Sequence, residues 1–254
     1  MRFWSLTFLV IPPPLSDLES FCERHGLPLI LDAAHAFGTS YQGKPAGSHG
    51  KIHVFSTSAT KLLCTGEGGI VATHDSALAK VLESMREYGH AENYETHYQG
   101  LNGRMSEFQG ALGIEALALL EEHAKRRNKI AEGYKKALSH LPIAFQEIEP
   151  QSRSSYKDFA ILLLDDWVIS RDDVSSTLES EGIPNRKYFS PPLHQQEFFL
   201  RYASRSQTLP NTERICQRIL CLPIFYDLKE SQIEQIAQVL TRIFHQQKTT
   251  VGQQ

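Results

Sequence analysis

Residues 29–38 read LILDAAHAFG, and residues 53–70 read HVFSTSATKLLCTGEGGI. Each stretch begins with a short apolar run that is typical of a buried strand, and each run leads directly into polar side chains. The first run ends at Asp32, and the second leads to Ser56 and then to Lys61. Because the carboxyl ends of neighbouring parallel strands open on one crevice, we expect these three side chains at one edge of a sheet.

A lysine amine, a carboxylate and a hydroxyl suit pyridoxal phosphate, which needs a Schiff base, a partner for its pyridinium nitrogen and donors for its phosphate. Taken singly, the residues have plainer explanations, because Asp32 can cap a helix and Lys61 can be a surface lysine. A P-loop does not fit, since its lysine follows the glycines whereas Lys61 precedes Gly66. A metal site at Asp32 and His35 is not favoured, because no further ligands stand at suitable spacing.

The order Asp-x-Ala-His-Ala-x-Gly, then Ser-x4-Lys, then Gly-Glu-Gly-Gly resembles the DegT/DnrJ/EryC1/StrS family of sugar aminotransferases. The resemblance implies that Lys61 bonds pyridoxal phosphate and that Asp32 keeps its pyridine nitrogen protonated. It further implies that Ser56 binds the phosphate and that His35 holds the ring or its phenolic oxygen. A nucleotide-linked keto-sugar as amino acceptor and an amino acid such as glutamate as donor are also implied.

Two later stretches carry the same resemblance. Residues 100–105, GLNGRM, are similar to the family's Gly-x-Asn-x-Arg-Met motif, which implies a homodimer in which Asn102 reaches the phosphate in the partner subunit. The local sequence alone favours a glycine-flanked turn as the explanation of Asn102. Residues 183–199, IPNRKYFSPPLHQQEFF, resemble the region that lines the substrate mouth, which places Tyr188 and His194 there. His194 beside two prolines is equally well explained as a structural loop histidine.

Composition and charge limit the classes of protein. The 254 residues are 41% hydrophobic and 22% charged, enough for one large domain or two modest ones. A net charge of −3 gives no global field for nucleic acid. Four cysteines without a CxxC pair indicate reduced thiols in a cytoplasmic protein. The N-terminal MRFWSLTFLVIPPP is too short to span a membrane, and we interpret it as a strand that ends at the prolines rather than as a signal peptide.

Capping signals and hydrophobic periodicity predict an alternation of helices and strands. The expected first helix, 16–25, has a capping box of Ser16 and Glu19 and ends at Gly26. A long polar loop, 89–103, precedes one long helix or two over 106–138. The other expected strands are 28–31, 70–73, 143–148 and 159–164, and the other expected helices are 76–88, 172–181, 211–219 and 230–245.

This alternation predicts an α/β protein. With the resemblance, it implies a partial fold-type I PLP-transferase: a large cofactor-binding domain in 1–120 with a mixed, mostly parallel sheet, its N-terminal part missing. A bridging helix and a smaller C-terminal α/β domain would occupy 121–254.

One departure from the family bears on function. Family members carry an upstream segment that supplies a Gly-Thr pair for the phosphate and a ring that stacks on the cofactor, and this chain begins after it. We therefore expect the chain alone to bind the cofactor weakly and to leave apolar surface uncovered. A non-catalytic paralogue that dimerises, or that binds a partner or ligand, is the second hypothesis.

Overall fold

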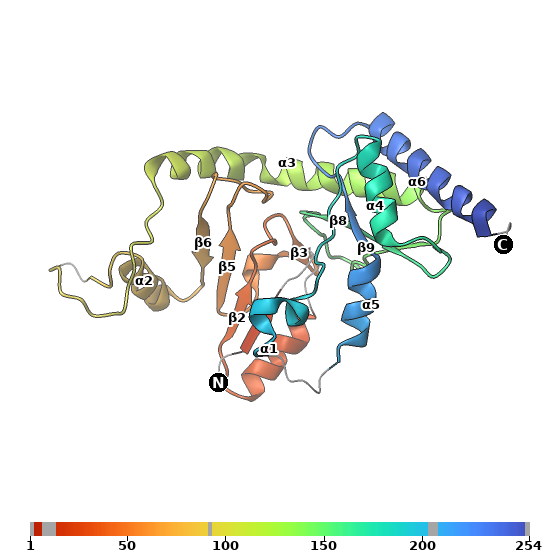
Figure 1. Cartoon of the computed structure of the whole chain (residues 1–254). Helices are drawn as coiled ribbons and strands as arrows, with labels where there is room; N and C mark the ends of the chain where they lie inside the picture. The colour runs from red at the N-terminus through yellow and green to blue at the C-terminus, as the bar shows by residue number, and fades with distance from the viewer. Residues whose placement is uncertain (1–2, 7–13, 91–92, 203–207, 252–254) are drawn as a thin grey trace. The chain divides into compact units, whose positions relative to one another are not determined.

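The computed structural model describes residues 3–6, 14–90, 93–202 and 208–251. The chain forms two compact units, the first made of residues 1–125 and 148–157 and the second of residues 126–147 and 158–254. The helix α3 (Glu107–Ala137) is continuous and contributes residues to both units (Figure 1). We expected the division after residue 120, and the units divide inside α3, after residue 125. No sequence pattern indicates that residues 148–157 belong to the first unit.

The first unit contains a four-stranded sheet in the order β1–β2–β5–β6. Its strands are β1 (Phe3–Leu6), β2 (Leu29–Asp32), β5 (Ile52–Ser56) and β6 (Gly69–Ala72). The first three are parallel and β6 is antiparallel to β5, which confirms the mixed, mostly parallel sheet (Figure 1). The N-terminal strand is present as β1, and residues 7–13 of that predicted segment lie outside the described residues.

Two helices, a short hairpin and a 3-10 turn accompany this sheet. They are α1 (Leu15–Arg24), α2 (Ser76–Met85), β3 (Ser40–Tyr41) with β4 (Lys44–Pro45), and the 3-10 turn η2 (Ala46–Ser48). Leu15 and Cys22 of α1 pack with Leu29 and Leu31 of β2, which forms one apolar cluster of the core. The alternate residues of β2 and β5 that face inward are thus the residues that hold the sheet.

The predicted capping box at the start of α1 is wrong. The helix begins at Leu15 after Pro14, and no side chain caps it. Glu19 instead accepts a 2.7 Å hydrogen bond from the Gly50 amide and lies 3.3 Å from Nδ1 of His49. Among the described residues, the Gly50 amide, in the loop before β5, would have no hydrogen-bond partner without this carboxylate. Satisfying it stabilises the fold more than a cap at the start of α1 would.

The predicted helix 76–88 ends earlier, at Met85. Asp75 caps its start by accepting from the amides of Ala77 and Leu78. Near its end, Tyr88 adopts a positive φ of 61°, which is outside the helical region and turns the chain into the 89–103 loop.

The second unit is built on an antiparallel sheet in the order β7–β8–β9, which confirms a smaller α/β unit. Its elements are β7 (Ile143–Phe145), β8 (Phe159–Leu163), α4 (Arg171–Ser180), α5 (Pro210–Arg218), β9 (Ile219–Leu222), α6 (Glu230–Val251) and the 3-10 turns η3 (Leu193–Gln195) and η4 (Glu197–Phe199). The predicted strand 143–148 is shorter than expected, and β9, which follows α5 directly, was missed. The rings of Tyr134 and Phe159 stack 4.8 Å apart in the core of this unit.

Large apolar side chains lie exposed on β6 and in the first half of α3, both in the first unit. On β6, Ile70 and Val71 are 37% and 48% exposed, and α2 buries none of its residues. In the first half of α3, Phe108 is 87% exposed and Ile114 is 71% exposed. The expectation of uncovered apolar surface is thereby confirmed for these two segments.

A histidine side chain, that of His53, is buried in the core of the first unit. His53 of β5 is 1% exposed, and within the described part of the chain neither of its ring nitrogens makes a hydrogen bond of normal geometry. Burial, together with the nearby His49 and His74, lowers the pKa of His53 to about 4, while the Ala46 backbone and Glu19 act in the opposite direction. The folded protein therefore holds this imidazole neutral across the physiological range.

We predict that stability falls as the pH drops from 6.5 towards 4. In that interval the unfolded chain binds a proton at His53 and the folded chain does not, so folding loses on the order of 3 kcal/mol across it. The variant His53→Leu should flatten this slope in urea unfolding, whereas His97→Gln, which alters a half-exposed side chain, should not. An unchanged slope in His53→Leu would contradict the assignment.

Candidate functional site

The ends of two neighbouring strands carry the first two predicted site residues. The strands β2 and β5 pair in parallel with the register Ile30↔Ile52 and Asp32↔Val54. Asp32 is the last residue of β2 and Ser56 is the last residue of β5. Both lie at the carboxyl edge of the sheet, as the sequence predicted.

Asp32 also shapes the turn that follows it. Its Oδ1 accepts a 3.1 Å hydrogen bond from the Ala34 amide, while the Ala33 amide donates to the Val54 carbonyl at 2.9 Å. The side chain is therefore oriented by its own backbone, in the manner of an Asx turn. No helix follows Asp32 in the described residues 33–39 that precede β3, so the helix-cap explanation of this residue is wrong. The turn hydrogen bond and a contact with a cofactor are compatible, because a carboxylate has two oxygens.

Lys61 lies in the connection between β5 and β6. Its amide donates to the Ser58 carbonyl at 2.9 Å, and Ser56 Oγ lies 3.3 Å from Ser58 Oγ. This connection contacts the turn after β2, since a Cβ placed on Gly38 would lie 2.7 Å from Cδ2 of Leu62. Gly38 also has a φ of +80°, so a larger residue there would be strained as well as crowded. The structure thus brings the Asp32 turn and the Lys61 connection together.

Residues from far along the chain hold the turn that contains His35. The hydroxyl of Ser155 donates to the His35 carbonyl at 2.9 Å. Arg153 donates through Nε to the Gly38 carbonyl at 3.0 Å and pairs with both oxygens of Glu121 at 2.7 and 2.9 Å. This arginine lowers the pKa of the Glu121 carboxyl. The sequence analysis missed Arg153 and Ser155, because no local pattern marks side chains that hydrogen-bond to backbone carbonyls more than a hundred positions away.

Asn102 lies in the long loop, in an isolated antiparallel bridge with Glu87. Its side chain is exposed, and the neighbouring Leu101 is 66% exposed. Gly89 and Gly100 permit the close return of this loop, because a Cβ on Gly100 would lie 2.1 Å from the Gly89 nitrogen. The role of Asn102 towards a partner subunit stays a prediction.

The two predicted substrate residues belong to the second unit. The guanidinium of Arg186 donates to the Tyr188 hydroxyl, and the Tyr188 ring stacks on Phe189 with centroids 4.7 Å apart. His194, in η3, has its Nε2 3.1 Å from Oε1 of Glu213 in α5. That contact lowers the pKa of Glu213 and connects two elements of the unit, as the structural explanation of His194 requires. A substrate role for Tyr188 or His194 stays a prediction.

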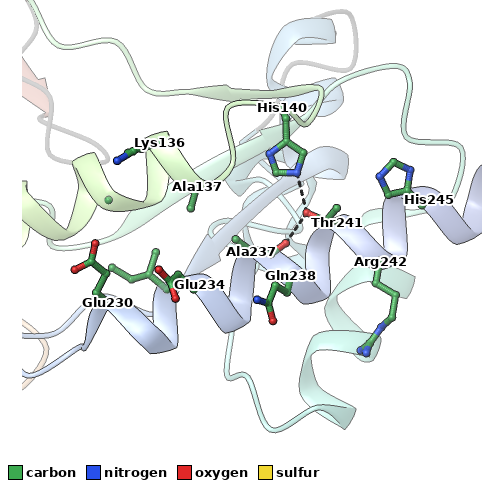
Figure 2. Close-up of a pocket in the computed structure, with 12 residues that line it drawn as sticks. Lys136, Ala137, His140, Glu230, Glu234, Ala237, Gln238, Thr241, Arg242 and His245 are labelled. Carbon is green, nitrogen blue, oxygen red and sulfur yellow. Dashed lines mark hydrogen bonds between the residues drawn. The ribbon is translucent and has the colours of Figure 1, made fainter.

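A groove of about 590 Å³ lies in the second unit, between the last turns of α3 and residues 230–245 of α6 (Figure 2). It contains none of the predicted site residues. Figure 2 shows His140 directed at Thr241, with Nε2 and Oγ1 2.9 Å apart, and Thr241 in turn donates to the Ala237 carbonyl at 2.7 Å. Arg242 pairs with Glu181 at 2.6 Å. These polar groups serve helix packing within the second unit, whereas Asp32 belongs to the first unit.

The donor set at that edge fits pyridoxal phosphate. A carboxylate, a hydroxyl and a primary amine come from adjacent strand ends and the connection that follows, and these are the groups that the pyridine nitrogen, the phosphate and the aldehyde require. Within the described ranges, no group of three or more His, Cys, Asp or Glu side chains is placed to hold a metal ion. None of the four cysteines forms a disulfide, and no described helix has the length and apolarity needed to cross a membrane.

Fold and site together define an α/β protein whose strand-end residues fit pyridoxal phosphate. The model of the DegT/DnrJ/EryC1/StrS aminotransferase family matches residues 12–241, and the chain belongs to this family. The family implies pyridoxal phosphate as the cofactor.

Three relatives illustrate the similarity. A UDP-N-acetyl-3-dehydro-alpha-D-glucosamine 3-aminotransferase of Acidithiobacillus ferrooxidans is 32% identical over 92% of this chain and 62% of its own length. EpsN of Bacillus subtilis, named as a candidate pyridoxal phosphate-dependent aminotransferase, is 31% identical over 91% of this chain and 60% of its own length. The crystal structure of a family member from Brucella abortus has a TM-score of 0.87 at 29% identity and covers 95% of this chain and 64% of that protein. The chain thus spans about three fifths of the length of the relatives it matches.

Proposed function

We propose that the protein is a pyridoxal phosphate-dependent aminotransferase that converts a nucleotide-linked keto-sugar into an amino-sugar, with an amino acid such as glutamate as donor. The observation that carries the proposal is the placement of Asp32 and Ser56 at the ends of adjacent parallel strands, with Lys61 in the connection that follows. The sugar-nucleotide class is supported by the relatives' names, among them a UDP-sugar aminotransferase.

Each residue has a stated task in this proposal. Pyridoxal phosphate, when bound, supplies an electron sink for the bonds at the reacting carbon. Asp32 presents its carboxylate to the ring nitrogen and keeps the proton there by charge attraction. Ser56 Oγ donates to the phosphate. Nζ of Lys61, once free, would act as the base that moves a proton between the substrate carbon and the cofactor carbon C4′.

Substrate contacts and assembly complete the proposal. His35 lies in the turn after Asp32 and is proposed to contact the ring, and Tyr188 and His194 are proposed to contact the sugar nucleotide. A homodimer in which Asn102 enters the partner's site is supported by the exposure of Asn102 and by the apolar side chains exposed on α3. We also propose a cytoplasmic location, on the strength of the cysteine pattern alone.

A non-catalytic protein that dimerises or binds a partner is the second candidate. The exposed apolar surface on β6 and α3 favours it, because such surface is typical of interaction sites. An intact set of Asp32, Ser56 and Lys61 favours chemistry. Covalent capture of the cofactor separates the two candidates, since a binding protein has no need of a reactive lysine.

Lys61 should be the residue that bonds the cofactor. Incubation with pyridoxal phosphate, reduction with borohydride and peptide mapping by mass spectrometry should place the label on Lys61. The variant Lys61→Ala should lose this label and the transamination, whereas Lys51→Ala, in the half-exposed pair with Asp75, should keep both. Label on another lysine, or no label at saturating cofactor, would contradict the proposed function and leave the binding-protein candidate.

Asp32→Asn should fold normally and lose turnover. The amide oxygen of asparagine still accepts from Ala34, so the free energy of unfolding should change by less than about 0.5 kcal/mol. Turnover should fall on the order of a hundredfold or more, because a neutral amide does not hold the ring proton. Asp75→Asn is the matched control, since Asp75 also accepts from backbone amides but lies at the start of α2. Turnover of Asp32→Asn within a few-fold of the parent would exclude the role.

Subunit mixing should test the place of Asn102. Lys61→Ala and Asn102→Ala chains should each be inactive, yet their heterodimers should regain activity at the one site that has an intact lysine and an intact asparagine. A mixture of Lys61→Ala with Asp32→Asn should stay inactive, because both residues belong to the same chain's site. Absence of complementation with proven subunit exchange would place Asn102 outside the partner's site.

A further inference from the structure

The connection that carries Lys61 is closed on itself by backbone hydrogen bonds. The Thr57 amide donates to the Gly68 carbonyl, and the Thr65 amide donates to the Thr57 carbonyl, each at 2.9 Å. Thr57 directly follows Ser56 at the end of β5, and Gly68 directly precedes β6. The position of the lysine therefore depends on how firmly these two ends are held together.

A buried pair of hydroxyl groups lies at this closure. Oγ1 of Thr57 and Oγ1 of Thr65 are 2.8 Å apart, and the two residues are 0% and 2% exposed. Thr65 Oγ1 also donates to the Glu67 carbonyl at 2.9 Å. Because a hydroxyl has one proton, Thr65 must then accept from Thr57, which fixes the direction of both hydrogen bonds.

The same carbonyl is held from the start of α3. Nε2 of Gln109 donates to the Glu67 carbonyl at 2.6 Å. Oε1 of Gln109 accepts from the amide and the hydroxyl of Ser106, at 3.0 and 2.9 Å. The side-chain amide of Gln109 therefore has one possible orientation: its oxygen faces the two Ser106 donors, and its nitrogen faces the Glu67 carbonyl. The connection is thus held to a helix that begins outside it.

A glycine makes this arrangement possible. A Cβ on Gly68 would lie 2.9 Å from Thr57 Oγ1 and 3.3 Å from Thr65 Oγ1, and Gly68 has a φ of +138°. Any side chain at this position would push the hydroxyl pair apart. The Gly-Glu-Gly-Gly sequence therefore has a packing reason as well as a conformational one.

We propose that Thr57, Thr65 and Gln109 are positioning residues for Lys61. They touch neither cofactor nor substrate; they hold the closed connection so that the lysine is presented at the edge where Asp32 and Ser56 lie. Displacement of a reacting group by about 1 Å costs on the order of a hundredfold in rate, which is the effect such a device prevents. This inference rests on the proposed function, because it takes Lys61 as the reactive lysine.

Thr65→Val tests the inference, since it keeps the branched shape and removes only the hydroxyl. Two readouts are used: hydrogen exchange of peptides covering 57–69 without cofactor, and the cofactor concentration that gives half-maximal borohydride labelling of Lys61. We expect exchange in that segment to accelerate about tenfold, and the half-labelling concentration to rise by a similar factor, as for one lost hydrogen bond of a buried pair. Thr65→Ser should restore both values.

Thr241→Val is the matched control, because it removes a hydroxyl that also has two partners but lies on α6. It should leave exchange over 57–69 and the labelling of Lys61 unchanged. If Thr65→Val labels Lys61 at the parent's cofactor concentration, or if Thr241→Val alters labelling equally, the positioning role is wrong while the proposed function stands. A parent chain that never labels at Lys61 overturns the proposed function and this inference with it.

Discussion

The parallel pairing of β2 with β5 is the constraint on which the candidate site depends. It sets Asp32 opposite Val54 and so brings the ends of both strands to one edge. The register is held by burial, since Leu29 and Leu31 of β2 and Phe55 of β5 face the core. A slip by one residue would turn these side chains to solvent and Asp32 to the opposite face of the sheet, so apolar packing and the placement of the carboxylate are one requirement.

This edge could be predicted from the sequence because it depends on local patterns. Short apolar runs that end in polar residues identify strand ends, and the resemblance then assigns chemistry to Asp32, Ser56 and Lys61. The residues that hold the site could not be predicted in this way. These residues donate to backbone carbonyls of distant turns: Arg153, Ser155 and Gln109. Every residue has a backbone carbonyl, so the amino-acid sequence does not mark which one accepts the hydrogen bond.

The local errors have a common physical cause. Ser16 and Glu19 have the spacing of a capping box, yet Glu19 hydrogen-bonds to Gly50 because tertiary structure brings an amide within reach. The expected helix 211–219 ran one residue into β9, and the strand itself was missed: all four of its residues are buried, so the sequence lacks the alternation that marks a half-buried strand. In both cases the structure depends on a partner that is remote in sequence: Gly50 for Glu19, and β8 for β9. Patterns over a few residues do not reveal such partners.

The helix α3 shows how one element serves two environments. In its second half Ala124, Ile130, Ala131 and Tyr134 are at most 1% exposed, and they belong to the cores of the units. In its first half the apolar side chains of Phe108, Leu112, Ile114, Leu117 and Leu119 are between 47% and 87% exposed. Helical spacing distributes these five residues over more than one face, and a helix that is apolar on several faces is typical of one that other polypeptide surrounds. Gln109 of the same half, oriented by Ser106 just before the helix, donates to the Glu67 carbonyl, so the exposed segment is also the one that holds the connection carrying Lys61.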